Sequence, residues 1–328
     1  MSRKRKDNMI IKRPQGGCKD GRVDGDKGMS RRSFLALGAL GGCAAACSTA
    51  TGAAAQQSFK GWPDSFGMLT DLTRCVGCRS CERACNEENN LPKPDKPFDD
   101  GSVFEHERRP DNKAYTVVNR YDSGGSPVYR KIQCNHCLEP ACATACPVHA
   151  YTKTPEGAVI YDKDVCFGCR YCMIACPFYV PAYDYDSALE PKIMKCVMCH
   201  DRLREGRAPA CAEACPMGAV TFGRRDAILK LARKRIEEKP DGYIQHIYGE
   251  HEAGGTSWLY ISGVPFEDLG FPQGVPEKPM IELTRNYLDS VPMVFTAWPA
   301  IFGLVYGAMR RKNNESDQKD GDVRSDGR

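Results

Sequence analysis

Sixteen cysteines, arranged in four groups of four, constrain this chain more than any other feature of its 328 residues. Each group opens with C-x2-C and closes with C-x3-C, and the gap between these two pairs is two, four, two and eleven residues in turn. A chain of this length can bury a core without disulfide staples, so spacing this regular points to metal chemistry. The groups are Cys75, Cys78, Cys81 and Cys85; Cys134, Cys137, Cys142 and Cys146; Cys166, Cys169, Cys172 and Cys176; and Cys196, Cys199, Cys211 and Cys215.

The spacing matches the way in which proteins hold a 4Fe–4S cubane. Three cysteines close together can wrap one cluster in a tight loop, and we expect the fourth to open a short helix that points away. In bacterial two-cluster ferredoxins this fourth cysteine ligates the neighbouring cluster, and a proline ends the loop. Pro147, Pro177 and Pro216 follow groups two, three and four, whereas Asn86 follows group one. The sixteen thiolates therefore predict four 4Fe–4S clusters with none left over.

Three other uses of the cysteines compete with this interpretation. Structural zinc also uses C-x2-C pairs, but it has no role for a third and fourth cysteine at these spacings. Disulfides form outside the cytoplasm, yet four repeats of one spacing are not a disulfide pattern. A 3Fe–4S cluster would follow from a replaced ligand, and every group keeps its four cysteines.

A few polar residues stand beside the cysteines. His136 and His200 are next to cluster cysteines, where we expect hydrogen bonds to a cluster or to the backbone rather than iron ligation. Lys195 precedes Cys196, and either tunes a cluster electrostatically or is solvated. The sequence has neither a G-x-G-x-x-G after a strand nor a Walker loop, so nucleotide binding has no support.

The N-terminal region resembles an export signal. Arg31 and Arg32 precede a mildly apolar run rich in Ala and Gly, the pattern of a twin-arginine signal for folded proteins. We expect cleavage after residues 53–55, which are three alanines, although Cys43 within a lipoprotein-like L-G-G-C is an alternative processing site. The basic stretch before Met29 is long, so translation could also begin there. A protein that receives its cofactor in the cytoplasm and is then exported folded needs such a signal.

The C-terminal region contains a candidate membrane helix. Residues 291–309 carry no charge, and Arg310, Arg311 and Lys312 follow them. A 19-residue helix is roughly 28 Å long at 1.5 Å per residue, close to the thickness of a bilayer core. The alternative is a buried helix of the soluble domain, since Pro292 and Pro299 interrupt the run. Positive charge stays cytoplasmic, so the cluster domain would lie on the periplasmic side of the inner membrane, with a cytoplasmic C-terminus.

The net charge of +4 does not describe the body of the protein. Residues 1–55 contain 11 of the 46 basic residues but only 4 of the 42 acidic residues. The rest of the chain is therefore slightly acidic. Nucleic-acid binding by the body therefore has no support, and no nucleic acid is expected among the partners.

Local patterns predict an α+β fold of tandem bacterial-ferredoxin-like 4Fe–4S domains followed by a single transmembrane helix. Strands are expected at 115–119 and 128–133 around a Ser-Gly-Gly-Ser turn, and again at 158–161 and 219–222. Residues 226–238 have helical periodicity and end before Pro240. Residues 91–111 are expected to be a surface loop and residues 263–279 a Pro/Gly-rich linker. The predicted domains are a leader (1–55), a four-cluster domain (56–223), a helix and linker region (224–290), the transmembrane helix (291–309) and a cytoplasmic tail (310–328).

The four cysteine groups, over residues 67–223, resemble the iron–sulfur electron-transfer subunits of respiratory oxidoreductases. This family includes the beta subunits of formate dehydrogenase, dimethyl sulfoxide reductase and nitrate reductase. The stretches D-K-D-V-C-F-G-C-R-Y-C-M-I-A-C-P (162–177) and Y-G-E-H-E-A-G-G-T-S-W-L-Y-I-S-G-V-P-F-E-D-L (248–269) look more specifically like hydrogenase-2-type iron–sulfur subunits. Nitrate-reductase-type members replace one group-three cysteine with tryptophan, but Cys169 is present here.

The resemblance implies how the cysteines are shared between clusters, because group one pairs with group four and group two with group three. Each set then combines three cysteines of one group with the last cysteine of the group with which it pairs. The implied sets are Cys75, Cys78, Cys81 and Cys215; Cys85, Cys196, Cys199 and Cys211; Cys134, Cys137, Cys142 and Cys176; and Cys146, Cys166, Cys169 and Cys172.

The resemblance also implies a function, in which the chain is a non-catalytic relay without a catalytic site of its own. It would carry electrons between the small and large subunits of a periplasmic nickel–iron hydrogenase and a quinone-reactive integral membrane subunit. The same relay serving a formate dehydrogenase or another molybdopterin subunit is the alternative. A structural metal module is the third interpretation, and iron and sulfide content would separate it from the other two.

Overall fold

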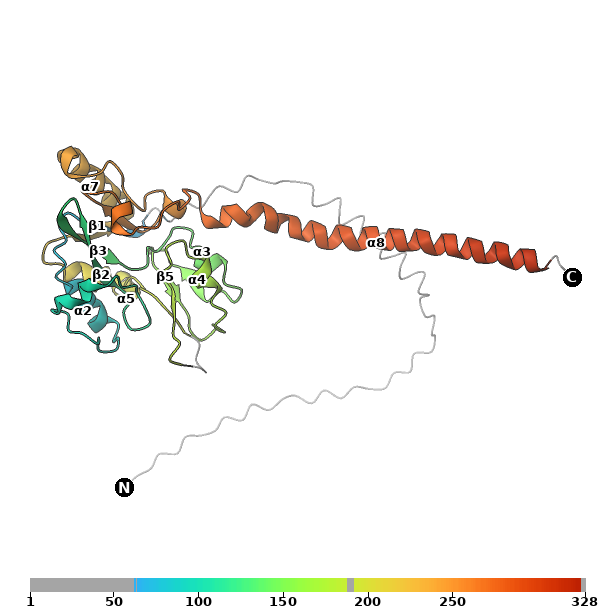
Figure 1. Cartoon of the computed structure of the whole chain (residues 1–328), viewed down its shortest axis with the longest axis horizontal. Helices are drawn as coiled ribbons and strands as arrows, with labels where there is room; N and C mark the ends of the chain where they lie inside the picture. The colour runs from blue at the N-terminus through green and yellow to red at the C-terminus, as the bar shows by residue number, and fades with distance from the viewer. Residues whose placement is uncertain (1–61, 63, 188–191, 326–328) are drawn as a thin grey trace, which may run out of the picture. The chain divides into compact units, whose positions relative to one another are not determined.

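The computed structural model describes residues 62, 64–187 and 192–325 (Figure 1). The leader, including Arg31, Arg32 and Cys43, lies outside the described residues. The described part combines helices with small β-sheets, so the expected mixture of helix and strand is confirmed. The strands are β1 (Phe66–Asp71), β2 (Val117–Ser123), β3 (Ser126–Ile132), β4 (Tyr151–Lys153), β5 (Val159–Tyr161), β6 (Ala182–Tyr183), β7 (Ile193–Met194), β8 (Val220–Arg224) and β9 (Trp258–Ile261). The helices are α2 (Ser80–Glu88), α3 (Ala141–Thr144), α4 (Tyr171–Ala175), α5 (His200–Arg204), α6 (Ala210–Glu213), α7 (Arg225–Glu238) and α8 (Met280–Ser325), with short 3-10 helices at Gly101–Glu105, Pro240–Gly242, Glu252–Gly254 and Glu267–Leu269.

A three-stranded sheet in the order β8-β1-β9 forms the framework of the domain. The central strand β1 runs antiparallel to β8 and parallel to β9, although β9 lies almost 190 residues later in the chain. Successive side chains of a strand point to opposite faces. Met68 accordingly packs with Trp258 and Tyr260 on the face toward the cysteine loops, whereas Leu69 packs against α7 on the other.

Helix α7 covers the outer face of this sheet through one apolar stripe. Ile228, Ala232 and Ile236 recur every four residues, which places them on one side of the helix, and all three are buried. They contact Leu69 and Ile261 of the sheet in one apolar cluster. The helix predicted for residues 226–238 is confirmed and begins one residue earlier.

The hairpin predicted around the Ser-Gly-Gly-Ser turn is also confirmed. Strands β2 and β3 pair antiparallel from Val117↔Ile132 to Ser123↔Ser126. Gly124 and Gly125 have φ of 63° and 79°, the left-handed values that a two-residue hairpin turn requires. Strands β5 and β8 lie where short strands were expected, within two residues at each end.

The Pro/Gly-rich segment 263–279 differs from the expected linker, because its apolar residues belong to the core. Phe266, Leu269 and Phe271 are all buried. The rings of Tyr248 and Phe271 lie 4.5 Å apart, centroid to centroid. Composition indicated the turns correctly but missed the three apolar side chains spaced between them. The expected surface loop at 91–111 contains one short 3-10 helix, Gly101–Glu105.

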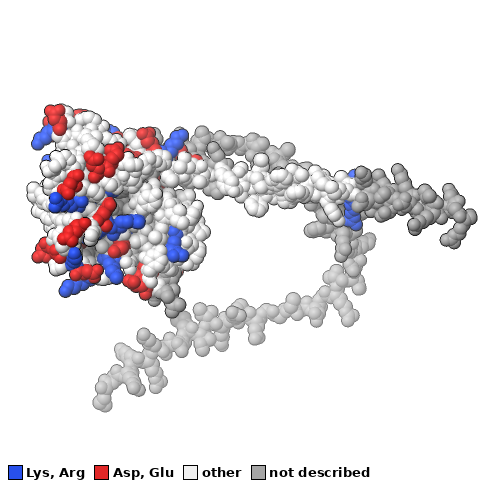
Figure 2. Space-filling model, viewed as in Figure 1, with Lys and Arg blue, Asp and Glu red and all other residues white. Residues whose placement is uncertain are grey.

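Helix α8 is rooted on the domain and then extends with exposed apolar side chains. Just before it, Pro276 and Glu277 accept backbone hydrogen bonds from Ala253 and Gly254, at 2.7 Å and 2.9 Å. The stretch Ser290–Arg311 is long and apolar enough to cross a membrane, with a mean hydropathy of 1.5. None of its most apolar window is buried, so the alternative of a buried helix of the soluble domain is wrong. In Figure 2 this stretch is white, with Lys/Arg blue at its far end.

Candidate iron–sulfur centres

The sixteen cysteines surround four cavities, and each cavity is lined by four of them. In every case three cysteines come from one group and the fourth from another. The cavities are similar in size, with empty volumes of about 300 to 400 Å³. We name each by one cysteine: the Cys78 cavity (with Cys75, Cys81 and Cys215), the Cys85 cavity (with Cys196, Cys199 and Cys211), the Cys142 cavity (with Cys134, Cys137 and Cys176) and the Cys169 cavity (with Cys146, Cys166 and Cys172).

Two pairs of short helices bring these cysteines together. Helix α2 packs against α6, which joins groups one and four, and α3 packs against α4, which joins groups two and three. We call the resulting units the α2–α6 half, which holds the Cys78 and Cys85 cavities, and the α3–α4 half, which holds the Cys142 and Cys169 cavities. The cysteine sets thus assembled are the same as those that the resemblance implies.

The short helices begin earlier than expected. The third cysteine of each group lies inside the helix, and the fourth lies within it or at most two residues beyond its end, so the fourth does not open it. Four residues advance an α-helix by slightly more than one turn. In α2, Cys81 lines the cavity of its own loop and Cys85 lines the next one, because the helix lies between the two cavities.

The C-x2-C loops share one backbone feature. The residue before the second cysteine has a left-handed conformation in all four groups, at Gly77, His136, Gly168 and Met198. At three of these positions the backbone N–H points at the sulfur of the first cysteine, with N to Sγ distances of 3.5 Å for His136, 3.4 Å for Gly168 and 3.3 Å for Met198. At Gly77 a Cβ would lie 2.4 Å from the Tyr129 ring, so only glycine fits there.

Burial controls the protonation of the thiols. It raises the pKa of Cys75 to about 11 and that of Cys196 to about 12. Metal binding requires thiolates, so loading these sites with iron must release protons. All sixteen cysteines are free thiols in the structure, which leaves every sulfur available. Four thiols around one cavity are the donor set that a 4Fe–4S cluster needs, so the residues fit that cofactor.

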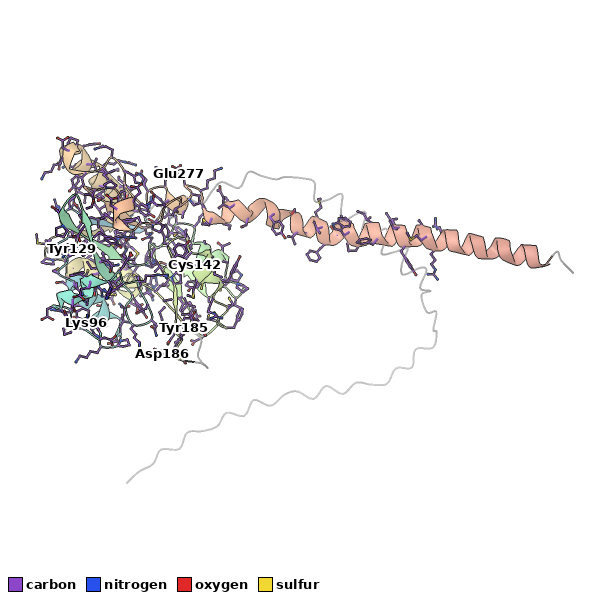
Figure 3. The ribbon with its side chains drawn as sticks, in the orientation of Figure 1. Lys96, Tyr129, Cys142, Tyr185, Asp186 and Glu277 are labelled. Carbon is purple, nitrogen blue, oxygen red and sulfur yellow. The ribbon has the colours of Figure 1, made fainter. Side chains whose placement is uncertain are left out.

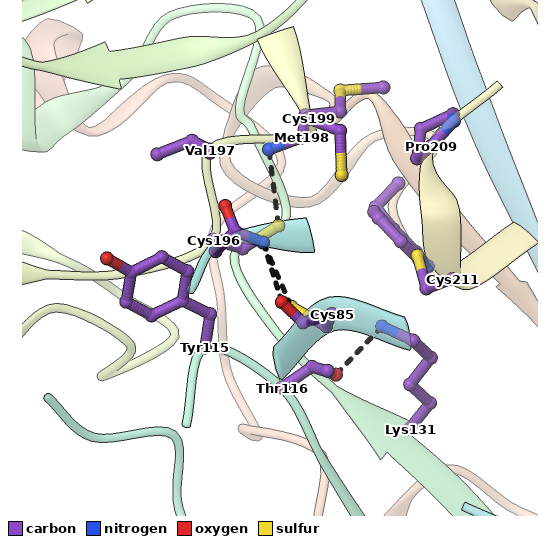
Figure 4. Close-up of a pocket in the computed structure, with 12 residues that line it drawn as sticks. Cys85, Tyr115, Thr116, Lys131, Cys196, Val197, Met198, Cys199, Pro209 and Cys211 are labelled. Carbon is purple, nitrogen blue, oxygen red and sulfur yellow. Dashed lines mark hydrogen bonds between the residues drawn. The ribbon is translucent and has the colours of Figure 1, made fainter. Parts of the chain in front are cut away.

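Buried cationic side chains accompany the thiols. Lys131, which lines both the Cys85 and the Cys78 cavities, is 2% exposed. Its ammonium donates a hydrogen bond to Thr116 Oγ1 at 2.8 Å (Figure 4) and another to Gln133 Oε1 at 2.9 Å. Burial alone would lower the pKa of Lys131, but nearby thiolates, Cys211 first among them, raise it above its ordinary value. Sequence analysis missed Lys131, since nothing in its local pattern indicates a buried charge.

Lys195 and His136 occupy the boundary between the halves. Lys195 lines the Cys142 cavity and is 2% exposed, so the alternative that it is solvated is wrong. Its ammonium donates to the carbonyl oxygens of Val159 and Cys196. His136 Nδ1 accepts a 2.9 Å hydrogen bond from the backbone N–H of Val159, which confirms the expected backbone bond. His200 lies 3.4 Å from a carboxylate oxygen of Glu156.

A buried ion pair fixes helix α2 to the β2–β3 hairpin. Glu82, which is 5% exposed, accepts from the Arg79 guanidinium at 2.9 Å and from that of Arg108 at 2.7 Å. Its other bond comes from the backbone N–H of Val118 at 2.6 Å. Because α2 carries Cys81 and Cys85, this carboxylate positions one cysteine of each cavity in the α2–α6 half.

The order of the four cavities across the domain follows from which cysteines are exposed and from where the two halves meet. Cys78 and Cys169 are exposed, each in a different half, whereas the Cys85 cavity has three buried cysteines. The two halves meet beside Lys195, which lines the Cys142 cavity and donates a hydrogen bond to the carbonyl oxygen of Cys196, a residue that lines the Cys85 cavity. The sequence of cavities is therefore Cys78, Cys85, Cys142 and Cys169, with an exposed cysteine at both ends.

Comparison with known proteins gives one family model and several relatives. A 4Fe–4S dicluster domain matches residues 127–225. A protein of Nitratidesulfovibrio vulgaris is 52% identical over 288 residues, which cover 87% of this chain and 78% of the relative. The hydrogenase-2 operon protein HybA of Escherichia coli is 36% identical over 75% of this chain and 84% of the relative. The formate dehydrogenase-O iron–sulfur subunit of Escherichia coli is 30% identical over 73% of this chain and 81% of the relative.

Proposed function

Because the chain belongs to the family of iron–sulfur subunits that includes HybA and the formate dehydrogenase iron–sulfur subunits, we propose that it is a four-cluster electron relay. In this proposal it connects the catalytic subunits of a periplasmic nickel–iron hydrogenase with a quinone-reactive integral membrane subunit, and has no catalytic site of its own. The observation that carries the proposal is the grouping of sixteen free thiols around four similar cavities.

We assign the four cysteines of each cavity as the iron ligands of one 4Fe–4S cluster. When bound, such clusters supply one-electron transfer at potentials that depend on hydrogen bonds, charge and solvent exposure. The chain's own contribution is to hold the thiolates, to donate backbone N–H groups to the first sulfur in three of the four loops and to bury three of the four cysteines of the Cys85 site. The single match to a dicluster domain covers groups two to four, and group one completes the second pair.

The order of the cavities defines a route with two terminal sites. At one end Cys78 is accompanied by Val76 and Met217, each 50% exposed, and at the other Cys169 is accompanied by Phe167, 58% exposed. Apolar side chains around an exposed terminal site favour close contact with a partner protein. Electrons would enter at one end and leave at the other through the inner Cys85 and Cys142 sites.

The position of α8 supports the proposal that the Cys169 end faces the membrane partner. Helix α8 contacts α3, which belongs to the α3–α4 half. Two backbone hydrogen bonds connect the start of α8 with the loop before α3. The N–H of Gly254 donates to the carbonyl of Glu277, just before α8, and the N–H of Leu138, just before α3, donates to the carbonyl of Gly255. Figure 3 shows Glu277 at the root of α8 and Cys142 in the part of the domain beside it. With Ser290–Arg311 in the bilayer, the Cys78 end is left for the hydrogenase subunits.

The proposed location follows from both ends of the sequence. A twin-arginine signal at Arg31 and Arg32 would export the folded, loaded protein, and the basic residues Arg310 and Arg311 would keep the C-terminus in the cytoplasm. The cluster domain then lies on the periplasmic side of the inner membrane, tethered beside its membrane partner.

The alternative partner is a molybdopterin subunit, as in a formate dehydrogenase. The hydrogenase-type partner is favoured because identity is higher to HybA, at 36%, than to the formate dehydrogenase subunits, at 30% to 32%. The segment 248–269 supports the same choice, since it resembles hydrogenase-2-type subunits and supplies strand β9 and part of the core.

Affinity purification of the full chain from solubilised membranes under anaerobic conditions tests the proposal. About 16 iron and 16 acid-labile sulfide per chain are expected, with hydrogenase subunits among the co-purifying chains. Stoichiometric zinc with little iron would refute the cluster assignment. If a molybdopterin subunit co-purifies instead of the hydrogenase subunits, the chain is still an electron relay, but its catalytic partner is the molybdopterin subunit.

A further inference from the structure

Lys131 carries a charge at an energetically unfavourable place. It is almost completely buried, and within the described part of the chain its ammonium is bonded to two neutral side chains, Thr116 and Gln133, rather than to a carboxylate. The ammonium also lies 4.6 Å from the ring centroid of Trp258. A buried cation without an anionic partner destabilises the fold, and an apolar residue of similar size would avoid that penalty. The fold alone therefore gives no reason for a lysine here.

The surroundings of Lys131 supply the missing anions. It lines the Cys85 cavity and the Cys78 cavity at the same time, so it lies between the two sites of the α2–α6 half. Cys75, Cys78, Cys81 and Cys215 line one of these cavities, and Cys85, Cys196, Cys199 and Cys211 line the other. Four thiolates at each site, once loaded, give both sites a negative charge that faces this ammonium.

We propose that Lys131 is a potential-setting residue shared by the two iron–sulfur sites of the α2–α6 half. Addition of one electron at either site adds one negative charge close to the ammonium, in a region of low dielectric where charges interact strongly. The lysine therefore stabilises the reduced form of both sites relative to the oxidised form. Because one side chain lies beside two sites, it raises both potentials together. The inference rests on the ligand sets proposed above.

Neighbouring residues hold the ammonium in place. Thr116 precedes β2 and Gln133 follows β3, so both ends of the hairpin position the Lys131 head group between the cavities. Gln133 is itself fixed, because its amide donates to the Tyr260 hydroxyl at 2.5 Å. The lysine is thus a positioned charge rather than a mobile one.

The test is a potentiometric titration of the full chain, followed by electron paramagnetic resonance, in Lys131→Met, Lys131→Gln and Lys131→Arg variants. In the two neutral variants, the ratio of reduced to oxidised protein at a fixed potential should fall at least tenfold at both α2–α6 sites, which is a shift of about 59 mV to lower potential for a one-electron couple. The arginine variant should restore most of the wild-type ratio. Lys153→Met is the matched control, since Lys153 is a partly buried, hydrogen-bonded lysine that lines neither cavity.

The outcomes separate this inference from the proposed function. Wild-type protein without iron and sulfide would refute the cluster assignment itself. Loaded wild type with unshifted potentials in the neutral variants, or an equal shift in Lys153→Met, would overturn only the role of Lys131. If the neutral variants fail to load the α2–α6 sites and the arginine variant loads them, the positive charge serves assembly of the sites, and the potential-setting role is overturned. Failure of all three variants to load would show a packing role and overturn it.

Discussion

Replacement of Glu82 by alanine should greatly accelerate the loss of the clusters. Glu82 is buried in helix α2 and bonded to Arg79, to Arg108 and to the backbone of Val118. Its removal leaves the Arg79 guanidinium, 3% exposed, without its carboxylate partner. It also leaves a buried backbone N–H without an acceptor. The expected result is a loosened α2, and with it displacement of the thiols of Cys81 and Cys85.

The magnitude follows from the burial of this ion pair. Breaking a buried pair by removing one partner costs about 3 to 5 kcal/mol, whereas domains are stable by only about 5 to 15 kcal/mol. At 1.4 kcal/mol per factor of ten, the lower value corresponds to an unfolding rate roughly 100-fold faster when the interaction is absent from the transition state. The matched control is Glu88→Ala on the same helix. Glu88 pairs with Arg202 at 2.9 Å but is 32% exposed, so its loss should cost less than about 1 kcal/mol.

The assay measures the rate at which iron–sulfur absorbance disappears in guanidinium chloride under anaerobic conditions. A rate is the right quantity, because proteins with tightly bound cofactors do not unfold in a simple two-state equilibrium. Glu82→Ala should bleach roughly 100-fold faster than wild type, and Glu88→Ala should stay within about fivefold. If the two variants bleach at the same rate, the buried pair does not hold α2 in place and the reasoning is refuted.

Three further predictions concern ligation, anchoring and export. Cys215→Ser should change the electron paramagnetic resonance signal of the site formed by Cys75, Cys78 and Cys81. Cys85→Ser should change the signal of the site formed by Cys196, Cys199 and Cys211. If each variant instead damages only the site of its own cysteine group, the proposed ligand sets are wrong. A stop codon at Val291 should leave about 16 iron per chain but release the protein from membranes, and should slow electron transfer to quinone more than transfer to a soluble dye; loss of iron would instead show that the segment is needed by the core. Lysine at both Arg31 and Arg32 should leave folded, iron-loaded protein in the cytoplasm, as seen by cell fractionation, and unchanged periplasmic accumulation would argue against a twin-arginine signal.

Local sequence patterns were sufficient to predict those elements whose conformation depends on residues close together in the chain. The period of four in Ile228, Ala232 and Ile236 predicts α7 to within one residue, and the Ser-Gly-Gly-Ser turn predicts the β2–β3 hairpin. In both cases the residues that decide the conformation lie within a few positions of one another. The parallel pairing of β1 with β9 had no such signal, since its partners are far apart in the chain.

Burial was the property that sequence reasoning predicted least well. The segment 263–279 has the composition of a linker, yet Phe266, Leu269 and Phe271 fill the core beside Tyr248. Lys131 and Lys195 belong to a residue type that is usually solvated, and both are buried against cysteine cavities. Whether a side chain is buried depends on what other elements pack over it, and that information is spread over the whole chain.

The sequence by itself determined the number and chemistry of the candidate sites, because C-x2-C and C-x3-C spacings place thiols within one loop or one helical turn. Only the tertiary structure decided which cysteines share a cavity, since that follows from the packing of α2 on α6 and of α3 on α4. The same packing placed one lysine between two cavities and left a sulfur exposed at each end, because side chains distant in sequence meet only when the helices that carry them pack together.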